Sequence, residues 1–473
     1  MSEWLRSVSP SDPDDEIGRF PVADAAAVEA AVARARLALP AWRDAGLEAR
    51  ARVLRRFRDL AKEAVSELGL LIAREMGKAI WDARGEAALL AAKIDATLEH
   101  GMPFVAPLDA GPGARTSVHP RGVLAVLGPF NFPAHLPNGH IVPALATGNA
   151  VVFKPSDQTP AVGEWMGALW RRAGLPPGLL EIVHGGAETG RALAVDAEVD
   201  GVLFTGSWAV GRALSLATQD QPGKLLALEL GGSNPVLVLD DADLELAVFE
   251  TALSICATTG QRCSCARRLF VHRSLVDAFT DRLTRVLRGV RVGSPLVEDV
   301  FMGPLVSTRA AESLARWRAQ GSEAGGERLI EADPGLAPPF VGPGLVRYPD
   351  TTQRHLVQRE EIFGPEAALY AIDDLDHAIA AANDSDYGLV ASVFTRDRTK
   401  WEHCVGRLAT GLLNWNRGTI GASGRLPFGG LRRSGNDRPA GILSTVYCTF
   451  HQAHLEGEGG LDPAKLPPGL PRP

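Results

Sequence analysis

Short apolar runs alternate with helical stretches through the middle of the chain, and this alternation limits the possible folds more than any other feature. The runs are bounded by Gly or Pro and cover residues 122–127, 150–153, 181–183, 201–204 and 235–239. Helical segments such as Pro160–Arg172 and Glu188–Val195 separate the later runs. Strands that alternate with helices form a parallel sheet with crossover connections. In such a sheet a nucleotide site is expected at the carboxyl ends of the strands.

The flanking regions extend this α/β pattern. The first hundred residues have apolar residues at helical spacing and are predicted to be mostly helical, with Asp24 capping the first helix. A second strand and helix series covers 242–394, with a loose Gly- and Pro-rich stretch at 321–349. At about 100–200 residues per domain, the length of 473 residues predicts about two to four domains.

Composition and charge exclude several classes of protein. The formal net charge of −7 argues against nucleic acid as a partner. The five cysteines are an odd number without a CxxC pair, so we expect neither a disulfide framework nor a metal site. The N-terminus lacks the apolar segment of a signal peptide, and no apolar run approaches the length of a membrane span. A cytoplasmic protein without membrane contact is therefore expected.

Two segments carry residue types suited to covalent catalysis. In 260–263, Cys263 follows a glycine turn and adjoins Arg262, whose charge would favour the thiolate. In 228–235, Glu229 lies between leucines and precedes two glycines, and burial would raise its pKa toward the range of a general base. Taken alone, a buried structural cysteine and a surface glutamate are the ordinary explanations.

Four further segments carry side chains suited to binding a substrate or cofactor. They are Asn131 within 128–133, Lys154, Ser156 and Asp157 within 153–157, the glycine turn of 204–211, and Glu361 and Phe363 within 361–365. The glycine turn has Gly-x4-Gly spacing, which differs from the Rossmann fingerprint. A turn asparagine, a solvated strand end and a loop glutamate beside a core phenylalanine are the structural alternatives, so no segment decides the function alone.

The six segments occur together in the order of the aldehyde dehydrogenase superfamily, which the chain resembles from about residue 18 to about residue 450. The resemblance implies oxidation of aldehydes to acids through a covalent thioester. Cys263 matches the nucleophile, and Asn131 matches the side-chain donor of the oxyanion hole. Glu229 matches the base that activates water for deacylation.

The resemblance also implies a domain organisation. It predicts a Rossmann-like NAD-binding domain, a catalytic α/β domain and a small β element that pairs subunits. The implied boundaries are 1–101 and 121–231 for the first, 232–439 for the second and 102–120 with 440–460 for the third, followed by an extended tail at 461–473. A homodimer or homotetramer is expected.

The remaining motif residues match the family's cofactor contacts. Lys154 and Ser156 match contacts to the adenosine ribose, while Glu361 and Phe363 match the nicotinamide ribose contact and its packing partner. The pyrophosphate turn is matched by Gly206, Ser207, Trp208, Ala209, Val210 and Gly211. Asp157 falls where many NAD-preferring members carry Glu, and a carboxylate there repels the 2′-phosphate of NADP. NAD is therefore the expected cofactor.

Within the superfamily, segments 132–143, 261–268 and 414–416 are similar to the N-succinylglutamate 5-semialdehyde dehydrogenases of arginine catabolism. Residues 434–439 are close to that pattern, whereas the loop 417–424 departs from it. The aldehyde substrate of this sub-family carries two carboxylates. Because the guanidinium fork suits carboxylates, the candidate substrate ligands are Arg262, Arg425 and Arg433. His135 and His140 are interpreted as structural residues.

Three other functions stay open. One is a different semialdehyde dehydrogenase, acting on succinate or glutamate semialdehyde. Another is a CoA-acylating aldehyde dehydrogenase, against which Glu229 argues because a base that activates water favours hydrolysis. The last is a non-catalytic structural protein on the same fold. The joint presence of Cys263, Glu229 and Asn131 argues against it.

Overall fold

Five parallel strands form the first sheet, in the spatial order β6-β5-β4-β7-β8. The structure is a computed structural model and describes residues 3–457, 459–460, 462 and 466–470. The strands are β4 (Val123–Leu127), β5 (Ala150–Lys154), β6 (Leu180–Ile182), β7 (Gly201–Thr205) and β8 (Leu225–Glu229). Together with a second sheet, described below, they confirm the predicted α/β class.

Four of these strands coincide with predicted apolar runs, but the fifth does not. The run predicted at 235–239 forms β9 (Asn234–Val238), which belongs to the second sheet. Strand β8 was missed because its sequence, LLALE, is a short apolar run that fits a buried helix as well as a strand.

The strand order reverses between β4 and β7, and this reversal positions the candidate residues. The chain passes from β4 outward to β6 and then returns to β7 on the other side of β4. In parallel sheets the connections diverge at such a point and leave a crevice at the carboxyl ends of the strands. Asn131, Lys154 and Glu229 all lie at or just after these carboxyl ends.

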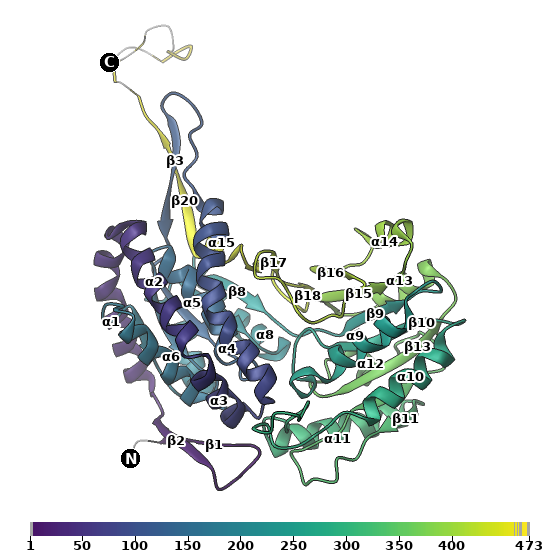
Figure 1. Cartoon of the computed structure of the whole chain (residues 1–473). Helices are drawn as coiled ribbons and strands as arrows, with labels where there is room; N and C mark the ends of the chain where they lie inside the picture. The colour runs from purple at the N-terminus through teal and green to yellow at the C-terminus, as the bar shows by residue number, and fades with distance from the viewer. Residues whose placement is uncertain (1–2, 458, 461, 463–465, 471–473) are drawn as a thin grey trace.

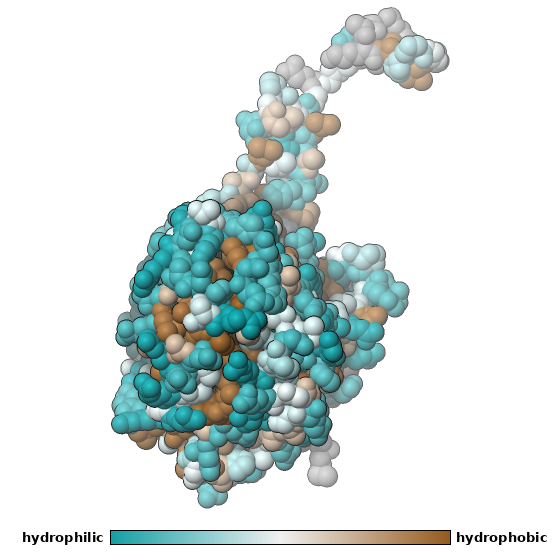
Figure 2. Space-filling model, turned by 90° about the vertical axis from the view of Figure 1, so that its right-hand side faces the viewer, coloured by the Kyte–Doolittle hydropathy of each residue, from teal (hydrophilic) through white to brown (hydrophobic). Residues whose placement is uncertain are grey.

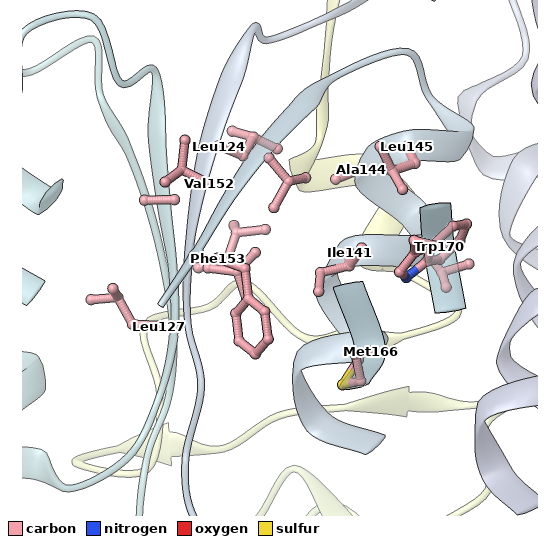
Figure 3. Packing of buried hydrophobic residues seen from close by; sticks show 14 of the residues in the cluster. Leu124, Leu127, Ile141, Ala144, Leu145, Val152, Phe153, Met166 and Trp170 are labelled. Atoms are coloured by element: carbon pink, nitrogen blue, oxygen red, sulfur yellow. The ribbon is translucent and has the colours of Figure 1, made fainter. Parts of the chain in front are cut away.

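Helices cover this sheet and complete its core. They are α1 (Ala25–Asp44), α5 (His135–Ala146), α6 (Pro160–Arg172), α7 (Ala187–Val195) and α8 (Trp208–Ala217). Phe153 of β5 points toward Ile141 of α5 and Met166 of α6, with Trp170 behind them (Figure 3). Each of these side chains is fully buried. Burial of one such apolar side chain contributes about 1.5–3 kcal/mol.

The N-terminal region is mostly helical, as predicted, but it begins with a small antiparallel sheet. The sheet pairs β1 (Trp4–Val8) with β2 (Glu16–Pro21). The predicted cap is confirmed, since the Asp24 carboxylate accepts a hydrogen bond from the Ala27 N–H (2.9 Å) at the start of α1. The following elements are α2 (Gly46–Glu63), α3 (Val65–Met76), α4 (Ile80–Asp95), η1 (Ala96–Gly101) and η2 (Met102–Val105).

The second sheet has seven strands in the order β11-β12-β13-β10-β9-β15-β16, and only the pairing of β11 with β12 is antiparallel. Its further strands are β10 (Ala266–His272), β11 (Glu327–Glu331), β12 (Gly344–Arg347), β13 (Glu366–Ile372), β15 (Val390–Phe394) and β16 (Leu412–Trp415). The stretch predicted as loose at 321–349 thus contains two strands of this sheet.

Helical segments flank the second sheet. They are α9 (Leu244–Cys256), η3 (Ala257–Gly260), α10 (Val276–Arg288), α11 (Thr308–Glu323), α12 (Leu356–Arg359), α13 (Leu375–Asn383) and α14 (Arg398–Cys404). Two short antiparallel strand pairs come from the later part of this region. One joins β14 (Tyr387–Gly388) to β18 (Leu431–Arg432). The other joins β17 (Pro427–Phe428) to β19 (Ala440–Gly441). Helix α15 (Ser444–Tyr447) comes next.

A two-stranded antiparallel ribbon projects from the body of the molecule (Figures 1 and 2). It pairs β3 (Ala114–Pro120) with β20 (Thr449–Leu455) along their full length. Exposed apolar residues on or beside the ribbon are Leu108, Phe450 and Leu455. The ribbon falls within the segments predicted to pair subunits, and the domain boundaries and the pairing stay predictions.

Part of the C-terminal segment has a described conformation. Of the extended tail predicted at 461–473, residues 461, 463–465 and 471–473 lie outside the described residues. Among residues 466–470, the Leu470 N–H donates to the Pro467 carbonyl (3.3 Å), which closes a turn. Each helix in the described part of the chain is too short or too polar to span a membrane.

Candidate active site

Cys263 lies on a tight loop between η3 and β10. Just before it, Thr258 and Thr259 have φ values of +54° and +53°, a left-handed conformation that β-branched residues rarely adopt. Gly260 has φ of +68°, and a Cβ there would lie 2.2 Å from the backbone of Gly364. Only glycine fits that position. Such strained turns persist where the surrounding structure fixes them, and they are concentrated at functional sites.

Asn234, at the start of β9, holds the loop that carries Cys263 in place through its side chain. Its side-chain amide donates to the backbone carbonyls of Cys263 (2.7 Å) and Cys265 (2.8 Å). Its carbonyl oxygen accepts from the Val390 N–H of β15 (3.2 Å). The position of the cysteine is therefore tied to two neighbouring strands of the second sheet.

Asn131 reaches this loop from the first sheet. Its buried amide Nδ2 donates to the backbone carbonyl of Gln261 (2.8 Å), two residues before Cys263. An amide nitrogen carries two N–H groups, so this contact uses one and leaves the second for another acceptor. The predicted nucleophile and the predicted oxyanion donor are thus brought together.

Glu229 ends β8 in a buried position, with only 5% of its surface exposed. Its Oε1 accepts a hydrogen bond from the Ala440 N–H (3.2 Å), while its Oε2 has no partner among the described residues. Burial raises the pKa of this carboxyl well above the usual 4.5. The sequence predicted this direction, and a raised pKa suits a general base.

The pKa of Cys263 shifts opposite to the direction expected from its sequence neighbour. Burial raises the pKa of the thiol, and the carboxyl groups of Glu361 and Glu229 raise it further. Arg262 lowers it, but this effect is smaller than that of burial. The prediction of a low-pKa thiol beside Arg262 is therefore wrong for this structure, and the proton must leave during the reaction.

Cys263 and Glu229 face one cavity of about 260 Å³. Its wall comes from α4, the start of α5, the cysteine loop and the loop that follows β16. The lining residues used below are Lys93, Phe132, His135, His140, Arg262, Ser264 and Gly441, and the loop 421–424 also contributes. A cavity of this size beside a cysteine and a carboxyl can hold a small substrate.

Arg262, predicted as a substrate ligand, already has an anionic partner. Its guanidinium pairs with the Asp82 carboxylate of α4 (2.7 Å) and donates to the Thr258 hydroxyl (2.8 Å). Thr258 also donates to Asp82 (2.6 Å), which closes a buried three-residue network. The network braces the cysteine loop against α4.

The other two predicted arginines lie away from the cavity wall. Arg425 is exposed and follows the lining loop. Arg433 pairs with Glu360 (3.2 Å) and Asp386 (3.3 Å) and lies over the ring of Trp208. The structure therefore directs neither guanidinium into the described cavity.

His135 and His140 line the cavity as neutral groups. Burial lowers the pKa of His135 to about 4 and that of His140 to about 3. His140 contacts the Tyr447 hydroxyl through Nδ1 (2.8 Å) and the Thr205 hydroxyl through Nε2 (3.2 Å). These contacts agree with a structural role for His140.

Lys154 ends β5 in a buried position. Its ammonium donates to the carbonyls of Pro155 (2.8 Å) and Gly185 (3.0 Å), and burial lowers its pKa. Ser156 follows it, and its hydroxyl donates to the exposed carboxylate of Asp157 (3.4 Å). A cation, a hydroxyl and a carboxylate in this arrangement suit the hydroxyl groups of a ribose.

The turn from β7 into α8 presents an exposed helix N-terminus. Ser207 caps α8, and its hydroxyl accepts from the Val210 N–H (3.4 Å). The first-turn residues Trp208 and Ala209 lie beside it. A Cβ at Gly211 would lie 2.7 Å from the Leu230 side chain, so glycine lets the helix pack closely on the sheet. Helix N-termini of this kind bind phosphate groups.

Glu361 lies against the glycine pair that follows Glu229. Its Oε1 accepts from the Gly232 N–H (3.0 Å), and a Cβ at Gly231 would lie 2.1 Å from its Oε2. Burial raises the pKa of Glu361 to about 7. Phe363 packs edge-to-face on Phe130 at 5.8 Å between ring centroids.

A second cavity, of about 400 Å³, is lined by Phe130, Gln261, Glu361 and Phe363. Gln261 directly precedes the Arg262-Cys263 pair, so this cavity lies beside the cysteine loop. Taken separately, this cavity could hold a ring, the α8 terminus suits a phosphate and the Lys154 strand end suits a ribose.

Sequence analysis missed the buried charges of α4. Asp82, Glu86 and Lys93 are spaced by four and seven residues, so they lie on one face of the helix. All three are buried. A row of charges on the same face as buried Leu90 is the signal that could have identified them. Asn234 gave no such signal, because its two acceptors are backbone carbonyls.

Comparisons with known proteins agree with this geometry. The aldehyde dehydrogenase family model matches residues 2–451. An N-succinylglutamate 5-semialdehyde dehydrogenase of Chromohalobacter salexigens is 43% identical over 458 residues, which are 95% of this chain and 92% of the relative.

Solved structures are also similar to this chain. An NAD-dependent aldehyde dehydrogenase from Sinorhizobium meliloti superposes with a TM-score of 0.93 at 29% identity, covering 98% of this chain and 93% of that one. An NADP-dependent enzyme of E. coli superposes with a TM-score of 0.90 at 31% identity, covering 95% and 94%. The chain belongs to the aldehyde dehydrogenase family.

Proposed function

We propose that this chain oxidises N-succinylglutamate 5-semialdehyde to N-succinylglutamate, with NAD as the hydride acceptor and a thioester on Cys263. The observation that carries the proposal is that Cys263 and Glu229 face one cavity while Asn131 contacts the cysteine loop. The identity of 43% with a relative of that name supports the choice of substrate. The family uses NAD or NADP, so the choice between them is part of the proposal.

The first step is attack of the Cys263 sulfur on the aldehyde carbon. Because the thiol pKa is raised, its proton must leave to solvent as the S–C bond forms. The carbonyl oxygen becomes an oxyanion. The second N–H of Asn131 and the backbone N–H of Cys263 would stabilise it, and loss of one such donor typically costs about 10²–10³ in rate.

Oxidation then converts the tetrahedral adduct to a thioester. NAD, when bound, accepts the hydride that leaves the substrate carbon. The chain's part is to bind and orient: Glu361 and Phe363 would hold the nicotinamide riboside, and Lys154 and Ser156 the adenosine ribose. The N–H groups at Ser207 and the first turn of α8 would bind the pyrophosphate.

Deacylation depends on Glu229. Its unpaired Oε2 can accept a proton from a water molecule as that water attacks the thioester carbon. As the C–S bond breaks, the proton held by Glu229 passes to the leaving sulfur, so the acid leaves and both the Cys263 thiol and the Glu229 carboxylate are restored. Because burial raises the pKa of Glu229, its ionised form is a stronger base than an ordinary carboxylate.

NAD rather than NADP is proposed from Asp157. Its carboxylate is exposed beside Ser156, where it could accept hydrogen bonds from ribose hydroxyls and would repel a 2′-phosphate. Overall similarity does not decide the cofactor, because the solved relatives include both NAD- and NADP-dependent enzymes.

A homodimer or homotetramer is proposed from the β3–β20 ribbon. The ribbon projects from the body and exposes Leu108, Phe450 and Leu455, which contact with a second subunit could bury (Figure 2). Closed symmetric assemblies are the common outcome for such interfaces.

The substrate assignment predicts the order of a kinetic panel. With NAD, kcat/KM should be at least about tenfold higher for N-succinylglutamate 5-semialdehyde than for succinate or glutamate semialdehyde, because fewer polar contacts form with the smaller aldehydes. A higher value for either smaller aldehyde would contradict the assignment. NADH formation that requires CoA would identify an acylating enzyme, and no NADH with any aldehyde would identify a non-catalytic protein.

Replacing Glu229 by Gln should separate the two half-reactions. Glu229→Gln removes the base for deacylation but leaves attack by Cys263. A burst of NADH near one per active site should precede a steady state slower by about 100-fold or more. The wild-type steady-state rate should rise with pH through a pKa well above 4.5, because the ionised form of Glu229 is the active one.

The control for that experiment is Cys263→Ala, which should give neither burst nor steady-state NADH. Normal steady-state turnover by Glu229→Gln without a burst would remove Glu229 from the mechanism.

The cofactor assignment predicts that Asp157→Asn weakens discrimination against NADP. Loss of the charge should lower the ratio of kcat/KM for NAD over NADP by about tenfold, which corresponds to about 1.4 kcal/mol. Asp277→Asn, an exposed residue of α10, is the matched control and should leave the ratio unchanged. An unchanged ratio in Asp157→Asn would mean that another residue selects the cofactor.

The assembly proposal predicts a particle mass in solution of two or four times the 50.2 kDa chain. Sedimentation equilibrium at micromolar protein measures this mass. A single species at the monomer mass would contradict the proposal.

A further inference from the structure

The cations around the substrate cavity are paired with carboxylates, with one exception. Arg262 pairs with Asp82 at 2.7 Å. Lys78, behind Phe132, pairs with Glu86 at 2.5 Å, and neither side chain of that pair is exposed. These two pairs leave Lys93 of α4 as a cation that lines the cavity without an anionic partner among the described residues.

Lys93 is deeply buried, with 7% of its surface exposed. Its ammonium donates to the Gly441 carbonyl (2.7 Å) and to the Ser444 hydroxyl (3.2 Å). Both acceptors are neutral. An ammonium has three N–H donors, and these two contacts use two of them. Gly441 also lines the cavity, so the ammonium lies at the cavity wall.

We propose that Lys93 binds a carboxylate of the aldehyde substrate through its remaining donor. The inference rests on the proposed function, whose substrate carries two carboxylates, and it names the residue that recognises one of them. Burying an unpaired ammonium is unfavourable, and a protein that retains one gains a strong interaction when an anion enters. The substrate anion would give Lys93 the carboxylate partner that Arg262 and Lys78 already have.

The positive charges around the cavity support the role of Lys93 in binding a carboxylate. Besides burial, the cations of Lys93, Lys78 and Arg262 all lower the pKa of His135. Lys93 also lowers the pKa of His140. The histidines are therefore neutral at pH 7, and the positive potential at this wall favours an anion. Burial lowers the pKa of Lys93 itself to about 8, a cost that an adjacent carboxylate would reverse.

A purely structural role is the competing explanation. Lys93 connects α4 to the segment that contains Gly441 and Ser444, and a neutral donor could make the same two hydrogen bonds. A structural brace would affect all substrates equally. A carboxylate ligand would affect only substrates that carry one.

The test compares charged and neutral aldehydes. Lys93→Gln keeps a donor without the charge, and Lys93→Met removes both. We expect each variant to lower kcat/KM for N-succinylglutamate 5-semialdehyde by about 10- to 100-fold, mainly through KM, as for one charge-assisted hydrogen bond. For pentanal, which has no carboxylate, kcat/KM should stay within about threefold. Lys62→Met, on the exposed face of α2, is the matched control.

A second measurement does not depend on turnover. Calorimetric titration with the product, N-succinylglutamate, should give a Kd for Lys93→Gln that is weaker than the wild-type Kd by a similar factor. If Lys93→Met does not fold, Lys93→Gln decides the question.

The outcomes distinguish a failure of the Lys93 proposal from a failure of the proposed substrate. An equal loss for pentanal and the dicarboxylate aldehyde, or no loss for either, would overturn the role of Lys93. If the wild-type enzyme prefers succinate semialdehyde, the proposed substrate is wrong, and Lys93 is judged by its effect on that carboxylated aldehyde. A wild-type enzyme that favours pentanal over every carboxylated aldehyde would overturn both.

Discussion

One buried face of α4 holds the two segments that carry Cys263 and Asn131. Asp82 pairs with the cysteine loop through Arg262. Glu86 accepts the N–H groups of Ala134 and His135 (3.0 and 3.1 Å), which fixes the start of α5 just after Asn131. The distance between these two groups therefore depends on the packing of a single helix.

Burial at this site has opposite consequences for binding and for chemistry. The low-polarity surroundings that strengthen hydrogen bonds also raise the pKa of Cys263 and of Glu229, so both favour their neutral forms before substrate enters. The carboxyl of Glu229 raises the pKa of the thiol further. A neutral pair avoids two buried negative charges, and the developing oxyanion becomes the first one, placed at the Asn131 amide. As a consequence, the Cys263 thiol must lose its proton in each turnover.

The sequence predicted the parts of the site that depend on local order. Alternating strands and helices place strand ends at one edge, and Lys154 and Asn131 lie there because of that rule. The pairing of Arg262 could not be predicted, because its partner Asp82 lies on α4, far away in the sequence. Residue type and closeness to Cys263 in the sequence therefore favoured Arg262 as a substrate ligand. Lys93 was not predicted for the same reason, because the folded structure is needed to show that a cation has no anionic partner.

Net charge is a poor guide to what a buried site binds. The chain carries −7 overall, and the proposed substrate is an anion, which suggests repulsion. Surface charges are screened within about 10 Å at moderate ionic strength, whereas an unpaired buried cation acts at short range in a medium of low dielectric constant. With Arg262 balanced by Asp82 and the pKa of Glu229 raised by burial, the cavity keeps the charge of Lys93. The local balance is then positive, which is the sign that a carboxylate requires.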